Sequence, residues 1–93
     1  MEFDLNQPGF QKDLLRLEKA ELLAFFKTLR KLQQLSWSQV YRDKGLRWES
    51  IKSITEDAHT LRVTQKCRAV VIRDGDALRF LSLHPDHDSA YKK

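Results

Sequence analysis

The sequence has few of the residues that cross-link small domains or break regular structure. Its 93 residues include one cysteine, three glycines and two prolines. With Cys67 alone, no intramolecular disulfide can form, so a reducing cytoplasm is the expected setting. No internal repeat, low-complexity segment or long linker is visible either. Residues 1–93 are therefore expected to form a single domain, because a chain of this length usually has one compact core.

Long apolar runs are also missing. No stretch approaches the roughly 20 apolar residues that a membrane span needs, so no membrane partner is expected. The segment "MEFDLNQPGF" lacks the basic and apolar parts of a signal peptide. Hydrophobic residues make up 41% of the chain and charged residues 32%, which is ordinary for a soluble globular protein and too apolar for a disordered one.

What the chain does have is a local excess of positive charge. The net charge is +4, and the segment from Ala58 to Arg73 contains four cations and no acid. These cations are Arg62, Lys66, Arg68 and Arg73. A solvated strand surface would explain them. Attraction to phosphates or to an acidic protein partner is the other interpretation.

Apolar residues recur at helical spacing from Phe10 to Leu35. The stripe comprises Leu14, Leu17, Leu22, Phe25, Phe26, Leu29 and Leu32, and we expect it to face the core. It is interrupted at 18–21, so either a hairpin of two helices or one kinked helix fits. Asn6 is a plausible helix cap, with Pro8 in the first turn. A capping box at 36–39 predicts a short further helix that ends at Gly45.

Strand patterns flank these helices. A short one lies at 2–5, and longer ones lie at 46–54, 59–72 and 77–83. The pattern at 59–72 predicts one strand, bulged or kinked at 64–66, and "RDGD" predicts a tight hairpin turn after it. The expected fold class is α+β: a small single domain in which an N-terminal strand precedes a helical hairpin packed on a mostly antiparallel sheet. One face of the sheet is left free of helices.

Two arginines of the basic segment are candidates for a site on that free face. Arg62 and Arg68 are six residues apart, so a regular strand would place both on the same side, although a one-residue bulge would break this inference. Arg68 sits within the apolar run "CRAVVI", where an unpaired charge is costly. It is expected either to pair with Asp74 or Glu49, or to meet an anion.

The segment "HPDHDSAY" brings His84, His87 and Tyr91 together near the end of the chain. It has three interpretations: a metal site, a solvated polar tail or a set of proton-transfer groups. Its spacing matches no familiar zinc pattern and no cysteine pair supports it, so no metal or cofactor is expected. Histidine exchanges protons near neutral pH, and arginine stabilises charge on a phosphoryl oxygen. Together these groups suit metal-free cleavage of RNA.

The order of these features resembles the RelE/ParE superfamily of bacterial type II toxins, including its HigB branch. The resemblance spans nearly the whole chain. Its best motif is "LRVTQKCRAVV", which is similar to the HigB-type strand pair in which a second arginine follows the first by six residues. A terminal segment containing His and Tyr after the last strand is also typical of the family. Asp86 and Asp88 make this segment longer and more acidic than the family's usual ending.

The resemblance implies a toxin that cuts messenger RNA on the ribosome and is neutralised by a cognate antitoxin protein. It implies that Arg68 contacts the scissile phosphate, that Arg62 is a second basic group, and that His84 or His87, with Tyr91, is the acid or base. Glu49 falls where relatives place a further acid or base. The cations expected to contact RNA are Lys44, Arg47, Lys52, Lys66, Arg73 and Lys92. The alternative is a non-catalytic, ParE-like gyrase-poisoning toxin or a degenerate binding module of the same fold.

Overall fold

The computed structural model describes residues 1–51 and 57–85. Three helices and five strands lie within them: α1 (Pro8–Leu15), α2 (Lys19–Gln33), α3 (Trp37–Arg42), β1 (Glu2–Asp4), β2 (Glu49–Ser50), β3 (Ala58–Arg62), β4 (Arg68–Asp74) and β5 (Ala77–His84). The strands form one sheet in the order β1-β5-β4-β3-β2. β1 runs parallel to β5, and the other neighbours are antiparallel. The expected α+β class is confirmed.

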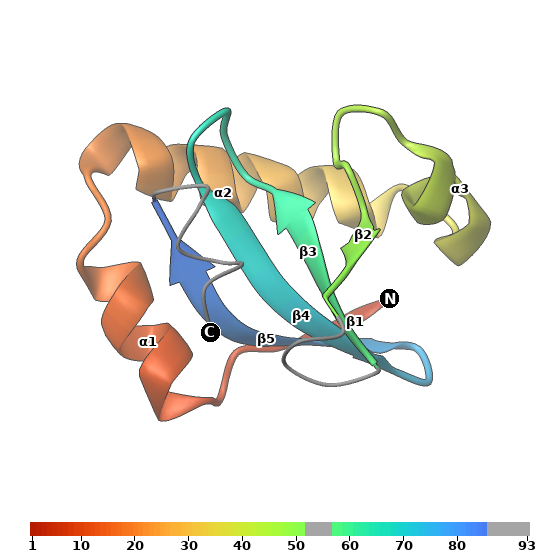
Figure 1. The fold of residues 1–93 in the computed structure, drawn as a ribbon, viewed down its shortest axis with the longest axis horizontal. Coiled ribbons are helices and arrows are strands. Elements are labelled where there is room, and N and C mark those ends of the chain that lie inside the picture. Colours follow the sequence, from red (N-terminus) through yellow and green to blue (C-terminus); the bar gives the residue numbers. More distant parts are fainter. Residues whose placement is uncertain (52–56, 86–93) are drawn as a thin grey trace.

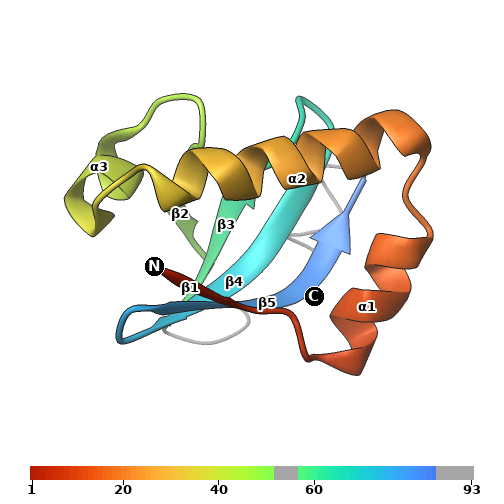
Figure 2. The same cartoon turned by 180° about the vertical axis from the view of Figure 1, so that it is seen from behind.

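The helices cover one face of the sheet (Figures 1 and 2). α2 lies across the strands, whereas α1 packs against β5 at the side of the molecule. The interruption at 18–21 separates two helices because Glu18 caps α2 and forms a reciprocal capping box with Glu21. The predicted capping box of α3, between Ser36 and Gln39, is present. The predicted cap at Asn6 is wrong, because Gln7 is the N-cap residue of α1.

The segment at 59–72 is a hairpin rather than one strand. The backbone reverses after Arg62, where the N–H groups of Val63 and Thr64 both donate to the carbonyl of Cys67. The Thr64 hydroxyl accepts from the N–H of Cys67 at 2.9 Å, which holds the turn without glycine or proline. The second predicted turn is confirmed, since Gly75 has a φ of 62° between β4 and β5. The strand expected at 46–54 is paired only over Glu49–Ser50, and 52–56 lie outside the described residues.

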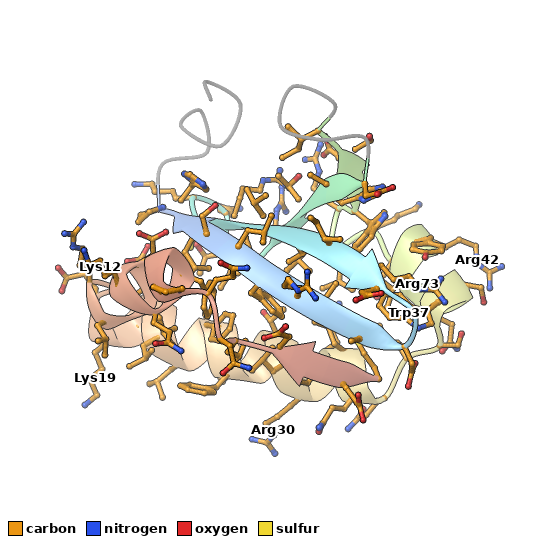
Figure 3. The ribbon with its side chains drawn as sticks, turned by 90° about the horizontal axis from the view of Figure 1, so that it is seen from below. Lys12, Lys19, Arg30, Trp37, Arg42 and Arg73 are labelled. Atoms are coloured by element: carbon orange, nitrogen blue, oxygen red, sulfur yellow. The ribbon has the colours of Figure 1, made fainter. Side chains whose placement is uncertain are left out.

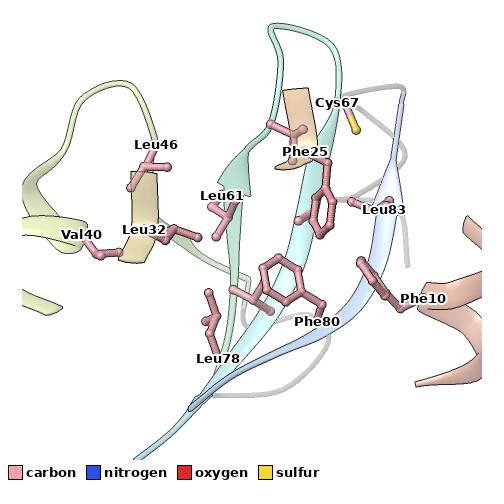
Figure 4. Close-up of a cluster of buried hydrophobic side chains, with 13 residues drawn as sticks. Phe10, Phe25, Leu32, Val40, Leu46, Leu61, Cys67, Leu78, Phe80 and Leu83 are labelled. Carbon is pink, nitrogen blue, oxygen red and sulfur yellow. The ribbon is translucent and has the colours of Figure 1, made fainter. Parts of the chain in front are cut away.

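The core lies between α2 and the sheet (Figure 4). Rings of Phe10, Phe25 and Phe80 contact one another with centroids 5.4–5.6 Å apart. The buried residues around them come from the helices, from the inner face of β3, β4 and β5, and from the loops before β2 and between β3 and β4: Leu32, Val40, Leu46, Leu61, Val63, Cys67, Ala69, Val71, Leu78 and Leu83. Phe26 was expected in this core but is 46% exposed. The opposite face has a smaller apolar cluster around Ala58 and Val70.

Candidate functional site

The face of the sheet turned away from α2 carries a row of three basic side chains. The register pairs Arg62 with Arg68 and Arg68 with His84 on the three adjacent strands β3, β4 and β5. Paired residues of neighbouring antiparallel strands lie on the same face, with β-carbons about 5 Å apart. We call Arg62, Arg68 and His84 the basic row. The structure thus brings three of the five predicted catalytic residues together.

The two arginines share a face as predicted, but for a different reason. The prediction treated 59–72 as one regular strand, in which residues six apart point the same way. In the structure the chain turns between Arg62 and Arg68, so the two residues are direct partners across the hairpin. A hairpin brings the two side chains much closer than a continuous strand would, where six residues span about 20 Å.

Arg68 is the most deeply placed member of the row, with 2% of its surface exposed. Its Nη1 lies 4.0 Å from Oε1 of Glu49 on β2, and the same oxygen lies 3.5 Å from Nε of Arg47. Burying a guanidinium requires such charge compensation. Of the two partners considered for Arg68, Glu49 is confirmed, whereas Asp74 bonds instead to Arg79 at 3.4 Å.

Arg62, the partner of Arg68 across the hairpin, is partly buried. Its backbone N–H donates to the carbonyl of Leu46 at 2.6 Å, which ties the β3 end to the loop before β2. Its Nε atom is buried and has no hydrogen-bond partner among residues 1–51 and 57–85. A buried donor without an acceptor costs about 1–3 kcal/mol. An anion that binds beside Arg62 would remove this cost.

His84, at the end of β5, is 6% exposed and is oriented by a neighbour on its own strand. Nε2 of His84 lies 2.8 Å from the hydroxyl oxygen of Ser82, two residues earlier on the same face. Such a hydrogen bond fixes the ring and influences which nitrogen holds the proton. The sequence interpretation missed Ser82, although a hydroxyl two residues before a strand histidine is a readable signal. It also missed the pairing of Arg47 with Glu49.

The other predicted residues fall into three groups. Lys66, Lys44 and Arg47 are exposed, the first in the β3–β4 turn and the other two in the loop that meets the β3 end at Leu46. Arg73 lies elsewhere: it pairs with Leu78, which faces the core, and its guanidinium sits 4.1 Å from the Trp37 ring. The structure therefore does not bring Arg73 to the basic row. His87, Tyr91, Lys52 and Lys92 lie outside the described residues.

The described part of the chain contains neither a clustered metal-ligand set nor a membrane-spanning helix. Within residues 1–51 and 57–85, no group of three His, Cys, Asp or Glu side chains is arranged to hold a metal ion. The tail residues of the metal interpretation, from Asp86 onward, are not among them. None of the helices seen in this structure is both long and apolar enough to cross a membrane.

No protein-family model matches the sequence, and no curated protein matches it. Solved structures do. YafQ from E. coli strain BL21(DE3) superposes with a TM-score of 0.71 at 12% identity, covering 97% of this chain and 94% of YafQ. A chain of the RelB–RelE antitoxin–toxin complex from Methanococcus jannaschii gives 0.68 at 19% identity, covering 98% and 95%. YoeB from Staphylococcus aureus, solved as a dimer, gives 0.61 at 15% identity, covering 90% and 94%.

The chain has the fold of the RelE-like toxins. The coverage is nearly complete in both directions, so the whole domain is shared and not only its sheet. At these identities the likeness concerns the fold, and the chemistry of this chain has to be argued from its own side chains.

Proposed function

We propose that this chain is the toxin of a type II toxin–antitoxin system and that it cuts messenger RNA on the ribosome without a metal ion. The observation that carries the proposal is the basic row: two arginines and a histidine side by side on the helix-free face of a RelE-like fold. The buried, unpartnered Nε of Arg62 among the described residues supports an anionic ligand there. We also propose a cognate antitoxin as protein partner and the cytoplasm as the site of action.

The proposed reaction uses the 2′-hydroxyl of the RNA as nucleophile. A base removes its proton, the 2′-oxygen attacks phosphorus, and the bond from phosphorus to the 5′-oxygen breaks. An acid then supplies a proton to that departing oxygen, leaving a cyclic phosphate. Arg62 and Arg68 would stabilise the negative charge that builds on the phosphoryl oxygens. His84 would transfer one proton, and Glu49, His87 and Tyr91 are the candidates for the other.

The remaining cations are proposed to hold the RNA rather than to react with it. Lys44, Arg47 and Lys66 are exposed around the Arg62 end of the basic row, where they can contact flanking phosphates. Lys52 and Lys92 stay proposals for the same role. Contacts of this kind position the strand and make binding sensitive to salt.

The decisive experiment maps RNA ends on ribosomes stalled with a defined messenger. We expect cuts within the A-site codon in a buffer freed of transition metals, in which Mg²⁺ is kept only to maintain the ribosome. Arg68→Ala should lower the cleavage rate at least about 100-fold, the order found when a transition-state charge stabiliser is lost. Arg30→Ala is the matched control, because it removes the same charge from an exposed position on α2 and should cut normally.

Two results would contradict the proposal. If Arg68→Ala cleaved RNA at the wild-type rate, Arg68 would not stabilise the scissile phosphate. If the wild-type protein made no cut, the proposed nuclease activity would be wrong. Circular dichroism of Arg68→Ala must match the wild type, because Arg68 is buried and its loss could also unfold the sheet.

A further inference from the structure

Five side chains form a connected cluster at the α3 end of the molecule, on the helix-covered side of the sheet. Trp37 and Tyr41 of α3 contact Trp48, with ring centroids 6.4 and 5.4 Å away. Trp48 stacks on His59 of β3 at 4.6 Å with an interplanar angle of 22°. Arg73 lies over the Trp37 ring and donates to the Tyr41 hydroxyl at 2.6 Å. We call these five residues the aromatic platform, and it contains both tryptophans of the chain.

The platform reaches solvent through Tyr41 and Arg73, whereas Trp37, Trp48 and His59 are half-buried and both tryptophans also pack against the core. Tyr41 is 44% exposed, and Arg73 is exposed beside it. Figure 3 shows Arg42 and Arg73 gathered with Trp37 at this end of the molecule, and Arg42 points outward from α3. Lys44 and Arg47 are exposed in the loop that follows. Of the nearby acids, Asp76 accepts from the Trp37 indole N–H and Asp43 pairs with Lys31.

The platform is continuous with the candidate site around the edge of the sheet. Trp48 and Glu49 are neighbours in sequence, yet Trp48 stacks within the platform and Glu49 contacts Arg68 of the basic row. Successive residues of an extended chain point to opposite faces, which explains the division. β2 is the last strand in the sheet order, so this edge separates the two surfaces. Arg47 precedes Trp48 and pairs with Glu49 at the same edge.

We propose that the aromatic platform binds bases of single-stranded RNA that extend beyond the basic row. The substrate class rests on the proposed function, and the platform itself adds a second contact surface. Proteins hold single strands by stacking bases on accessible aromatic rings while neighbouring cations follow the backbone, and the platform presents Tyr41 beside Arg73 and Arg42. Tyr41 is the most exposed ring of the platform, and it would carry the first base.

A protein partner fits this surface less well than RNA does. Protein interfaces are also rich in tyrosine, tryptophan and arginine, but their buried centre is depleted of charged residues. The exposed aliphatic side chains, Leu15 and Leu23, lie on α1 and α2, whereas the platform exposes a tyrosine among arginines and a lysine. Positive charge and aromatic faces together match the phosphates and bases of a nucleic acid.

The test uses intrinsic fluorescence, because every tryptophan of the chain lies in the platform. A short oligoadenylate titrated into the purified protein, without ribosomes, should quench this fluorescence by stacking. Tyr41→Ala should weaken oligoadenylate binding about tenfold, and Tyr41→Phe, which keeps the ring, should bind as the wild type does. Phe26→Ala is the matched control: Phe26 is 46% exposed but lies on α2, so binding should not change.

Inorganic polyphosphate separates base stacking from attraction to phosphate. It should not quench the tryptophans, although it competes for the cations. Equal quenching by both probes, or unchanged affinity in Tyr41→Ala, would overturn the proposal and leave the platform as packing or as a protein contact. This binding test does not depend on cleavage. If the Arg68→Ala experiment contradicted the nuclease proposal, the quenching of tryptophan fluorescence by oligoadenylate would still be a valid result.

Discussion

At the scale of single residues, the reactivity of the Cys67 thiol tests whether this side chain is buried. Its side chain is fully buried, and burial, assisted by the charge of Glu21, raises the pKa of the thiol to about 11 from an ordinary value of 9.0. At pH 8 the reactive thiolate is therefore about 100-fold rarer in the folded protein than in the unfolded chain, a factor of ten for each pKa unit. We expect iodoacetamide to modify Cys67 at least that much more slowly in buffer than in urea, as followed by mass spectrometry. Equal rates would show that the site is open.

The same shift predicts how stability depends on alkaline pH. Above pH 9 the unfolded thiol ionises while the folded thiol keeps its proton, so the unfolded state binds fewer protons. The free energy of unfolding should consequently fall as the pH rises from 9 toward about 11. Cys67→Ala should lose this component of the pH dependence, which urea titrations at each pH would reveal.

Residue chemistry was the easiest part of the site to predict. Arg68 stood out because a charge within "CRAVVI" needs compensation, and the structure supplies Glu49 at 4.0 Å. Ser82 was missed because its importance comes from the 2.8 Å distance between its hydroxyl and Nε2 of His84, which only the structure shows. Arg73 was expected to contact RNA as one of the four cations between Ala58 and Arg73, without a prediction of which face it occupies. Arg73 is five residues after Arg68 on the same strand, and an odd offset places two side chains on opposite faces of a sheet. Arg73 therefore lies on the helix-covered face, over the Trp37 ring.

At the scale of elements, the outer edge of β5 depends on a side chain of α1. β1 pairs with β5 only from Ala77 to Arg79, so the later part of this edge needs another acceptor. Asp13 provides it: its Oδ2 accepts the backbone N–H of Leu83 at 3.0 Å. Asp13→Ala should lower the free energy of unfolding by about 1–3 kcal/mol, because it leaves a partly buried N–H unpaired.

Urea denaturation measures this effect directly. Lys12→Ala is the matched control, since Lys12 is the exposed neighbour on the same helix and surface substitutions usually change stability by less than about 0.5 kcal/mol. If Asp13→Ala were as stable as Lys12→Ala, the α1–β5 contact would not contribute to holding that end of the sheet.

Element boundaries were harder to predict than element types, and the reason is physical. Sequence interpretation looks for glycine and proline at turns, yet the β3–β4 turn is held by the hydroxyl of Thr64. One long strand was therefore predicted where a hairpin exists. Similarly, the break at 18–21 is a helix start capped by Glu18, a residue less often found there than serine or aspartate. The turn at Gly75 and Asp76 was predicted correctly because its chemistry is local.

At the scale of the whole molecule, the site exists only because four strands are in register. Arg62, Arg68 and His84 share a row through β3, β4 and β5, and Glu49 reaches it from β2. Sequence spacing alone could place residues on faces but not across strands, since register is set by packing against the core. The basic row and the aromatic platform thus both depend on the same sheet remaining intact.

A single core substitution should therefore unfold both surfaces together. The Phe80 ring contacts those of Phe3, Phe10 and Phe25 at 6.3, 5.4 and 5.5 Å, which links β1, α1 and α2 to β5. Phe80→Ala should cost about 3–5 kcal/mol, a large part of the roughly 5–15 kcal/mol available to a small domain. Phe26→Ala removes an exposed ring and should cost far less.

Two probes of the same urea transition test whether the molecule unfolds as one unit. Tryptophan fluorescence reports on the α3 end through Trp37 and Trp48, and far-ultraviolet circular dichroism reports on all helices and strands. For the wild type and Phe80→Ala the two curves should coincide, with the midpoint lower in the variant, because one cooperative core supports both ends. A fluorescence transition that kept its midpoint in Phe80→Ala would mean that the aromatic platform is held together by its own ring contacts, independently of the core beneath the basic row.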